Sequence, residues 1–320
     1  MNDFQVNKYI TLRLENGKTN IYINGSLFRQ CKLLLLEIPV KQISSLDEIE
    51  SIDEAVECLG SIHEFVETLE PDDNTFILPH PETEFWGHCS NLQVWYENFY
   101  DTRLLHSNLS FPLLKKLTEV GDPLAKKVFA EEILKRLQSG YPSVIQYLEK
   151  EKYTKFISRQ DLFLSVLDAE EAEVMLELEN LLDREFQIDD TMENLEDMQT
   201  SITISRRKVI KLQIVGCKLK DLPEPIKKFK HLKHLYLNGN DFVTLPEWIG
   251  EIKNLESLDV SSCDLESIPE SFGKLSCLNN LFLSNNYFQK LPNILLNLIN
   301  LEILTINENE NHTYQILSTH

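Results

Sequence analysis

Leu232-Lys233-His234-Leu235-Tyr236-Leu237-Asn238-Gly239-Asn240-Asp241-Phe242-Val243-Thr244-Leu245-Pro246 is the clearest pattern in the chain. Apolar residues stand at its first, fourth, sixth and eleventh positions, Asn stands at the ninth, and Leu-Pro ends it. The phrase returns every 23 residues, opening at Val209, Leu232, Leu255, Leu278 and Leu301. A fixed period over five registers predicts a repeat architecture rather than a single packed core.

Each copy is too short to enclose its own leucines, but stacked copies share one apolar column. The Leu-x-x-Leu-x-Leu segment predicts a short strand, with its leucines turned inward and the residues between them turned outward. Side by side, these strands predict a parallel sheet whose outward residues line a concave face.

The phrase resembles the leucine-rich repeat in its 23-residue form with Leu-Pro in the second half, over residues 209–309. It is similar to the repeats of Ras-associated scaffold proteins and of plant intracellular repeat proteins. The resemblance implies an α/β leucine-rich repeat solenoid over residues 209–320, with four full repeats and a truncated fifth. It also implies a scaffold that binds another protein in signalling, with a small GTPase as one candidate partner.

The ninth position of each copy calls for a small polar side chain that bonds the backbone where the strand turns. Cys217, Asn240, Cys263, Asn286 and Asn309 fill this position. Two of the cysteines therefore have a structural explanation, and we expect neither to be reactive.

We expect the binding function on the three outward rows, because they form one broad, rigid, solvent-facing surface. The central row holds Gln213, Tyr236, Asp259, Phe282 and Thr305; one flanking row holds Lys211, His234, Ser257, Asn280 and Ile303, and the other Val215, Asn238, Ser261, Ser284 and Asn307. Tyr236 and Phe282 are the candidate anchors, since aromatic side chains dominate binding surfaces. The alternative is that the two rings pack on each other or beneath a neighbouring domain.

Two other features of the repeats have ordinary structural explanations. His234, Ser257 and Asp259 form a set that short polar residues on adjacent strands produce by chance, so no catalytic triad is inferred. The basic run from Arg206 to Lys233 could bind an anion, but its charges are spread around a whole turn. Pairing with the acidic sequence beside it, or plain solvation, is the favoured interpretation.

Residues 168–208 form an acidic connector before the first repeat. Ala169–Asp183 has helical apolar spacing, with Asp168 and Glu171 placed as a capping pair. Ile202-Thr203-Ile204 alternates like a strand, and Arg206-Arg207-Lys208 is the expected turn into the first repeat. Helix and strand together predict the N-terminal cap of the solenoid, since its first edge needs a cover.

Residues 1–167 predict a mainly helical α+β domain. A β-hairpin is expected near residues 9–23, turning at Asn16-Gly17. Helices are expected over residues 51–69, 111–120, 142–149 and 158–167, and another from the Asp122-Pro123 cap to about Ser139, before Gly140. Lys18–Leu36 and Phe85–Leu92 are similar to an uncharacterised archaeal module that precedes leucine-rich repeats, a resemblance that implies no activity.

Residues 79–106 are the one place where chemistry is conceivable, because His80, His88, Cys89 and His106 accompany several carboxylates and tryptophans. A metal site or a cysteine nucleophile would need side chains that converge. Neighbouring His88 and Cys89 point in different directions on a helix or strand, and no paired metal-ligand spacing occurs. Burial of the aromatic residues as part of a core is the favoured interpretation, and we expect no metal.

Composition limits the remaining possibilities. Hydrophobic residues make up 42% and charged residues 26% of the 320, as in globular proteins, and the net charge is −20. This charge disfavours nucleic acid and anionic membranes as partners, and no apolar run is long enough to span a bilayer. Six cysteines without paired spacing, and no apolar leader, predict reduced thiols and a cytoplasmic location.

The sequence thus predicts a non-enzymatic interaction protein without a cofactor. No phosphate-binding glycine loop is present, which disfavours a nucleotide-dependent enzyme. The alternative is an enzyme with a His/Cys site around residues 80–106 that uses the repeats to select its substrate.

Overall fold

The computed structural model describes residues 2–29, 80–189, 200–290 and 292–307. The chain divides into two compact units, residues 1–132 and residues 133–320. The domain boundaries expected at residues 167/168 and 208/209 stay predictions. The helix expected over residues 51–69, together with Cys31, Cys58 and Asn309, lies outside the described residues.

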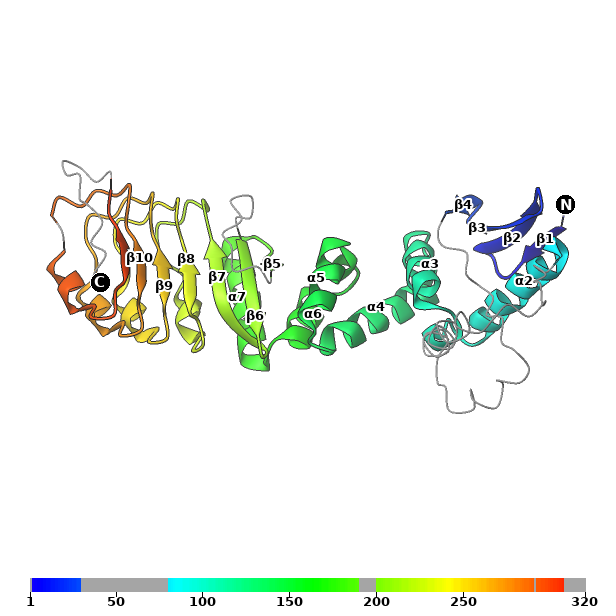
Figure 1. Ribbon diagram of the computed structural model, residues 1–320, viewed down its shortest axis with the longest axis horizontal. Coiled ribbons are helices and arrows are strands. Elements are labelled where there is room, and N and C mark those ends of the chain that lie inside the picture. Colours follow the sequence, from blue (N-terminus) through cyan, green and yellow to red (C-terminus); the bar gives the residue numbers. More distant parts are fainter. Residues whose placement is uncertain (1, 30–79, 190–199, 291, 308–320) are drawn as a thin grey trace, which may run out of the picture. The chain divides into compact units, whose positions relative to one another are not determined.

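The first unit contains a four-stranded antiparallel sheet (Figure 1). Its strands, β1 (Asn2–Gln5), β2 (Ile10–Glu15), β3 (Lys18–Ile23) and β4 (Ser26–Phe28), pair in chain order. The expected hairpin is confirmed: Ile10 lies opposite Ile23, and Asn16 and Gly17 adopt the positive φ that a two-residue turn requires. The two outer strands were not expected.

Helices follow the sheet in the first unit, and the one over residues 81–97 was not expected from the sequence. They are α2 (Pro81–Glu97), the 3-10 helix η2 (Thr102–Leu104), α3 (Ser107–Glu119) and α4 (Pro123–Gln138), which ends in the second unit. Asp122 Oδ1 accepts hydrogen bonds from the N–H groups of Leu124 and Ala125, at 3.0 and 3.3 Å. The Asp-Pro start of α4 is therefore confirmed.

A hydrogen-bonded chain of polar side chains lies at the core of the first unit. The hydroxyl of Tyr100, a fully buried residue, donates to Asp122 Oδ2 at 2.7 Å and accepts from Asn7 Nδ2 at 2.9 Å. Its ring centroid lies 4.6 Å from that of buried Trp95. Burial and the hydrogen bond to Asp122 raise the pKa of Tyr100. This chain ties the sheet, the end of α2 and the start of α4 together.

The second unit begins with short helices and continues into a seven-stranded sheet. The helices are α5 (Pro142–Lys150), the 3-10 helix η3 (Tyr153–Phe156), α6 (Arg159–Val166) and α7 (Ala169–Leu182). The strands are β5 (Gln187–Ile188), β6 (Thr200–Ser205), β7 (Lys208–Ile214), β8 (His234–Tyr236), β9 (Ser257–Asp259), β10 (Asn280–Phe282) and β11 (Ile303–Thr305). They lie side by side in chain order, with β7 to β11 parallel and β6 antiparallel to β7 (Figure 1).

A 3-10 helix follows each of the strands β7 to β10 and begins after the proline of the repeated phrase. These helices are η4 (Glu224–Lys228), η5 (Glu247–Glu251), η6 (Glu270–Lys274) and η7 (Asn293–Asn297). Proline suits this place because its φ is fixed and it has no N–H to satisfy. The inward leucines Leu212, Leu235, Leu258 and Leu281 are fully buried. The period of 23 residues therefore corresponds to one strand and one 3-10 helix.

The ninth position of the phrase links neighbouring copies through hydrogen bonds. Asn240 Oδ1 accepts from the N–H groups of Cys217 and Leu219, and its Nδ2 donates to the carbonyls of Ile214 and Leu237. Asn286 makes the equivalent bonds to the N–H of Leu265 and the carbonyls of Val260 and Leu283. The backbone-bonding role expected for this position is confirmed for both asparagines.

One expectation for the connector is wrong. Asp168 precedes α7 but makes no side-chain capping bond. Its carboxylate binds Lys208 Nζ at 2.5 Å, which lowers the pKa of Asp168, and Glu171 Oε2 accepts from the N–H of Val209 at 2.6 Å. The two carboxylates instead bind the start of β7, Asp168 through the Lys208 ammonium and Glu171 through the Val209 N–H. The strand and turn over residues 202–208 are confirmed.

No helix in the described ranges has the length and apolar character needed to cross a bilayer.

Candidate functional site

The outward rows expected from the sequence are in register in the sheet. Gln213, Tyr236, Asp259, Phe282 and Thr305 are successive partners across β7 to β11. Lys211, His234, Ser257, Asn280 and Ile303 are partners in the same way. Partners in a ladder point to the same side of a sheet, so each row shares one face.

Both rows extend onto strands that precede the first repeat, and the sequence did not predict this extension. Thr203 on β6 lies opposite Lys211, and Ser201 lies opposite Gln213. Gln187 on β5 then pairs with Ser201. The signal was present, because the alternation of Ile202 and Ile204 already implied outward polar residues on a strand next to β7. The face therefore has seven strands rather than five.

Exposure divides the twelve candidate binding residues into two groups. Lys211, Gln213 and Ser257 are 1%, 2% and 3% exposed. His234, Tyr236, Asn238, Asp259, Ser261, Asn280, Phe282, Ser284 and Thr305 are half-buried. A partner would therefore reach the rows mainly from β8 onward, where the two aromatic residues lie.

Lys211 and Tyr236 contact each other across the first two repeat strands. The Lys211 ammonium lies 5.3 Å from the centroid of the Tyr236 ring, within range of a cation–π interaction. Burial lowers the pKa of Lys211, and the nearby negative charge of Asp189 opposes that shift. One face of the Tyr236 ring is therefore covered by a side chain of the same protein.

Asp259 lies between the two aromatic residues of the central row. Its Oδ1 accepts from the N–H and the hydroxyl of Ser261, at 2.9 and 2.6 Å. Burial raises the pKa of Asp259 and lowers that of His234. Among the described residues no hydrogen bond joins His234, Ser257 and Asp259, so the three do not form a triad in this structure.

The third row lies where each strand turns. The carbonyls of Asn238, Ser261, Ser284 and Asn307 accept hydrogen bonds from residues one repeat earlier, namely Gly216, Gly239, Ser262 and Asn285. All four donor residues have positive φ, between 52° at Ser262 and 73° at Gly239. This row is therefore partly committed to holding the repeats together.

The alternative site around residues 80–106 lies on α2 and the segment after it. His88 is 3% exposed, and its Nε2 lies 3.1 Å from Glu84 Oε1, one helical turn earlier. Cys89 is 1% exposed, and burial raises its thiol pKa to about 12. Such a thiol stays protonated at neutral pH, which makes it a poor nucleophile.

The aromatic residues of this segment are only partly core residues. Phe85 and Trp95 are fully buried, whereas Trp86 is 53% exposed, so its expected burial is wrong. No group of three or more His, Cys, Asp or Glu side chains that could hold a metal occurs within the described ranges.

Residues 203–319 match the family model described as leucine-rich repeat region. This part of the chain is similar to leucine-rich repeat regions. No curated protein sequence matches the chain.

Three solved structures that are similar to part of this chain are the following. A leucine-rich repeat protein of Leptospira interrogans, LIC12759, is 28% identical with a TM-score of 0.30, covering 39% of this chain and 31% of its own. The PEPR1–AtPEP1 complex is 28% identical with a TM-score of 0.30, covering 34% and 16%. The leucine-rich repeat domain of APL1B is 24% identical with a TM-score of 0.28, covering 30% of each chain. Each match spans less than a third of the other chain.

Proposed function

We propose that the repeat region forms a solenoid that binds another protein through the concave face, chiefly over β8 to β11. The observation that carries this proposal is the central row, in which Tyr236, Asp259 and Phe282 are partners on three successive strands. Two half-buried rings flank one carboxylate on a regular sheet. Aromatic side chains supply large contact area, and the carboxylate supplies charge selectivity.

The chemistry of the row favours a partner segment with an apolar–basic–apolar pattern. Strands lie about 4.8 Å apart, so the two rings are separated by about 10 Å, which suits one helix or loop. The second oxygen of Asp259, Oδ2, has no hydrogen-bond partner among the described residues, so a basic side chain of the partner could bind it. A small GTPase remains one candidate, on the strength of the resemblance to Ras-associated scaffold proteins.

The proposal treats the protein as a cytoplasmic scaffold and not as an enzyme. The buried, protonated state of the Cys89 thiol and the pairing of His88 with Glu84 support this choice. Enzymatic use of residues 80–106 would need both groups to be rearranged.

The experiment is site-specific photocrosslinking followed by titration. A photoreactive residue replaces Thr305 on the concave face or, as the control, exposed Lys274 on η6. A protein captured from native lysate only through position 305 is then purified and titrated against Tyr236→Ala, Phe282→Ala and Asp259→Lys. Tyr287→Ala is the matched control, since this tyrosine is 47% exposed outside the rows.

We expect each concave-face variant to weaken binding by about 1–3 kcal/mol, with Asp259→Lys the most damaging. Tyr287→Ala should bind like wild type. If all three concave-face variants also bind like wild type, the proposal is wrong.

A further inference from the structure

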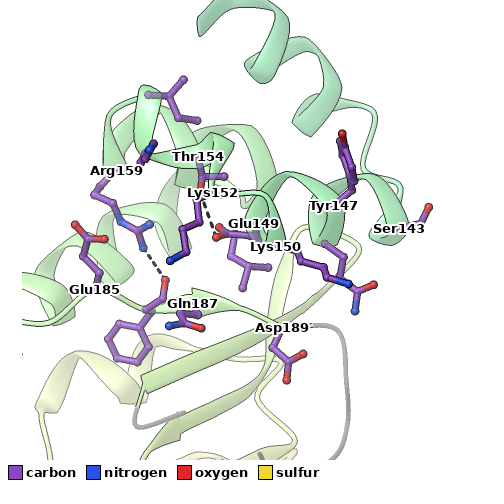
Figure 2. A pocket seen from close by; sticks show the side chains of 15 residues that line it. Ser143, Tyr147, Glu149, Lys150, Lys152, Thr154, Arg159, Glu185, Gln187 and Asp189 are labelled. Carbon is purple, nitrogen blue, oxygen red and sulfur yellow. Dashed lines mark hydrogen bonds between the residues drawn. The ribbon is translucent and has the colours of Figure 1, made fainter. Parts of the chain in front are cut away.

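A cavity of about 890 Å³ lies in the second unit, between α5, η3 and the edge strand β5 (Figure 2). Figure 2 shows Lys150 and Lys152 between α5 and the strand that carries Gln187 and Asp189. A phosphate or a metal ion would fill only a small part of this volume, whereas a segment of several residues would fit.

Three lysines line the cavity, and one of them, Lys155, lies over the Phe156 ring, 4.9 Å from its centroid. Lys150, Lys152 and Lys155 are exposed, and none forms an ion pair with any described residue. In a chain of net charge −20, three unpaired lysines within six positions are unexpected, because acidic side chains are abundant. Unpaired positive charge at a cavity favours an anionic ligand.

The backbone holds Lys152 in a costly conformation. Lys152 has φ 56°, in the left-handed region that glycine or asparagine normally occupies just after a helix. Its N–H donates to the carbonyl of Glu149, which fixes the end of α5. A lysine therefore lies at the cavity in a backbone conformation that glycine, which has no Cβ atom, would adopt with less strain.

Hydrogen bonds hold the segment before β5 at one side of the cavity. Arg159 donates from Nη2 to Glu179 Oε1 at 2.5 Å and to the carbonyl of Phe186 at 2.8 Å. Glu179 Oε1 also accepts from the N–H of Phe186 at 2.7 Å. The residue that precedes β5 is thus bound through both its N–H and its carbonyl, and the strand is held in place beside the cavity.

Strand β5 is the last strand in the order of the sheet. Asp189 donates its N–H to the carbonyl of Ile202, and Gln187 pairs with Ser201 on β6. Hydrogen bonding alternates along a parallel strand, so the N–H and carbonyl of Ile188 point away from β6. An extended segment could pair with this outer edge through its main chain.

One more polar atom in the cavity has no partner. Glu149 Oε2 accepts from the Thr154 hydroxyl at 3.2 Å, but the buried Oε1 makes no hydrogen bond. Burial raises the pKa of Glu149, so a donor such as a peptide N–H at Oε1 would stabilise the charged carboxylate. Cations, a strand edge that pairs with no described residue and an acceptor without a partner among the described residues therefore lie around one cavity.

We propose that this cavity binds an extended, acidic segment of a partner protein, which pairs with the edge of β5 and places its carboxylates beside Lys150 and Lys152. This site is separate from Tyr236, Asp259 and Phe282, so the proposal does not rest on the function proposed for the concave face. The occupant is a peptide because a small anion would use the lysines without using the strand edge.

The test is fluorescence anisotropy with the full chain and a fluorescein-labelled peptide of about ten residues in which Glu and Val alternate. Alternation places every Glu on one face of the added strand. We expect saturable binding to wild type and a loss of about tenfold or more for the double variant Lys150→Glu/Lys152→Glu. The control Lys253→Glu/Lys274→Glu makes the same change in net charge at exposed lysines elsewhere in the unit and should bind as wild type does.

Two further arms separate the sources of affinity. A peptide N-methylated at alternate residues cannot donate to the strand edge and should bind about tenfold more weakly. Tripolyphosphate should compete poorly. The proposal is overturned if wild type does not bind the peptide, if both double variants lose affinity equally, if N-methylation has no effect, or if tripolyphosphate displaces the peptide at lower concentration than the unlabelled peptide does.

Discussion

The side-chain oxygen of Asn240 accepts a hydrogen bond from the backbone N–H of Cys217, one repeat earlier, at 3.0 Å. The same amide forms hydrogen bonds with three further backbone groups. One side chain therefore provides hydrogen-bond partners for the backbone of the preceding repeat and of its own repeat. Buried backbone groups that lose such partners are costly, because no water replaces them.

Asn240→Leu is therefore expected to lower the free energy of unfolding by about 3 kcal/mol, since it strands several buried backbone groups at once. Urea denaturation followed by circular dichroism measures the change. Asn254→Leu is the matched control: Asn254 is exposed and makes one bond, to the carbonyl of Lys230, so its loss should cost less than about 1 kcal/mol. Equal costs would mean that the buried amide has no special role.

Gly250 has no room for a side chain, because a Cβ atom would lie 2.3 Å from the carbonyl oxygen of Ser271 on the next 3-10 helix. Gly250→Ala should destabilise the protein by about 3 kcal/mol, since η5 and η6 would have to separate. At Gly273 the nearest atom is the flexible end of Ile294, at 3.0 Å. Gly273→Ala should therefore change stability by less than about 1 kcal/mol, and thermal melts of the two variants compare them directly.

Ser262 occupies a left-handed position, with φ 52°, where the first two repeats carry Gly216 and Gly239. Ser262→Gly is expected to raise the free energy of unfolding by about 0.5–1 kcal/mol through relief of this strain. Ser262→Val should lower it by about 1–2 kcal/mol, because a β-branched residue tolerates positive φ least. Denaturant melts in which the two variants shift the midpoint in the same direction would refute the assignment of strain.

The described thiols should differ sharply in reactivity. Cys277 is exposed, whereas burial raises the pKa of Cys263 to about 11 and that of Cys89 to about 12. Iodoacetamide reacts with thiolates, so at pH 8 it should modify Cys277 first and spare the other two until the protein unfolds. Peptide mapping by mass spectrometry reads each site, and early labelling of Cys89 would revive the nucleophile hypothesis.

The same shifts predict how stability depends on alkaline pH. Each buried thiol has a folded-state pKa above the usual 9.0, so the unfolded chain loses its proton first. The contribution is therefore fully present below about pH 9 and is lost as pH rises towards 11 to 12. Cys263→Ala should reduce this alkaline loss relative to wild type, as urea melts between pH 8 and pH 10.5 would report.

The repeats were predictable because the residues of each copy determine its strand, its turn and its proline. The period of 23 residues then determines the register of Tyr236, Asp259 and Phe282 without knowledge of the rest of the chain. The burial of Lys211 and Gln213 was not predictable in this way. It depends on the strands beyond the first repeat, whose pairing is set by tertiary contacts and not by a local pattern.

The sequence rule for helix capping was also wrong where a second element of the fold binds the capping residues. The spacing of Asp168 and Glu171 is that of a capping pair, and only the fold brings Lys208 and the N–H of Val209 within their reach. The cavity beside β5 was missed for the same reason, because Lys152 and Ile188 are separated in sequence and become neighbours only through the packing of α5 on the sheet.

The amide bonds at the ninth position divide the stack into pairs. Asn240 joins the first copy to the second and Asn286 joins the third to the fourth, whereas the junction between the second and third copies has Cys263, whose thiol lies 3.6 Å from the carbonyl of Leu237. A thiol is a weak donor and cannot replace four amide bonds. Backbone amide protons at the junction between the second and third copies should therefore exchange with solvent earlier than those on either side. The stack should then unfold as two groups of repeats rather than one copy at a time from its end.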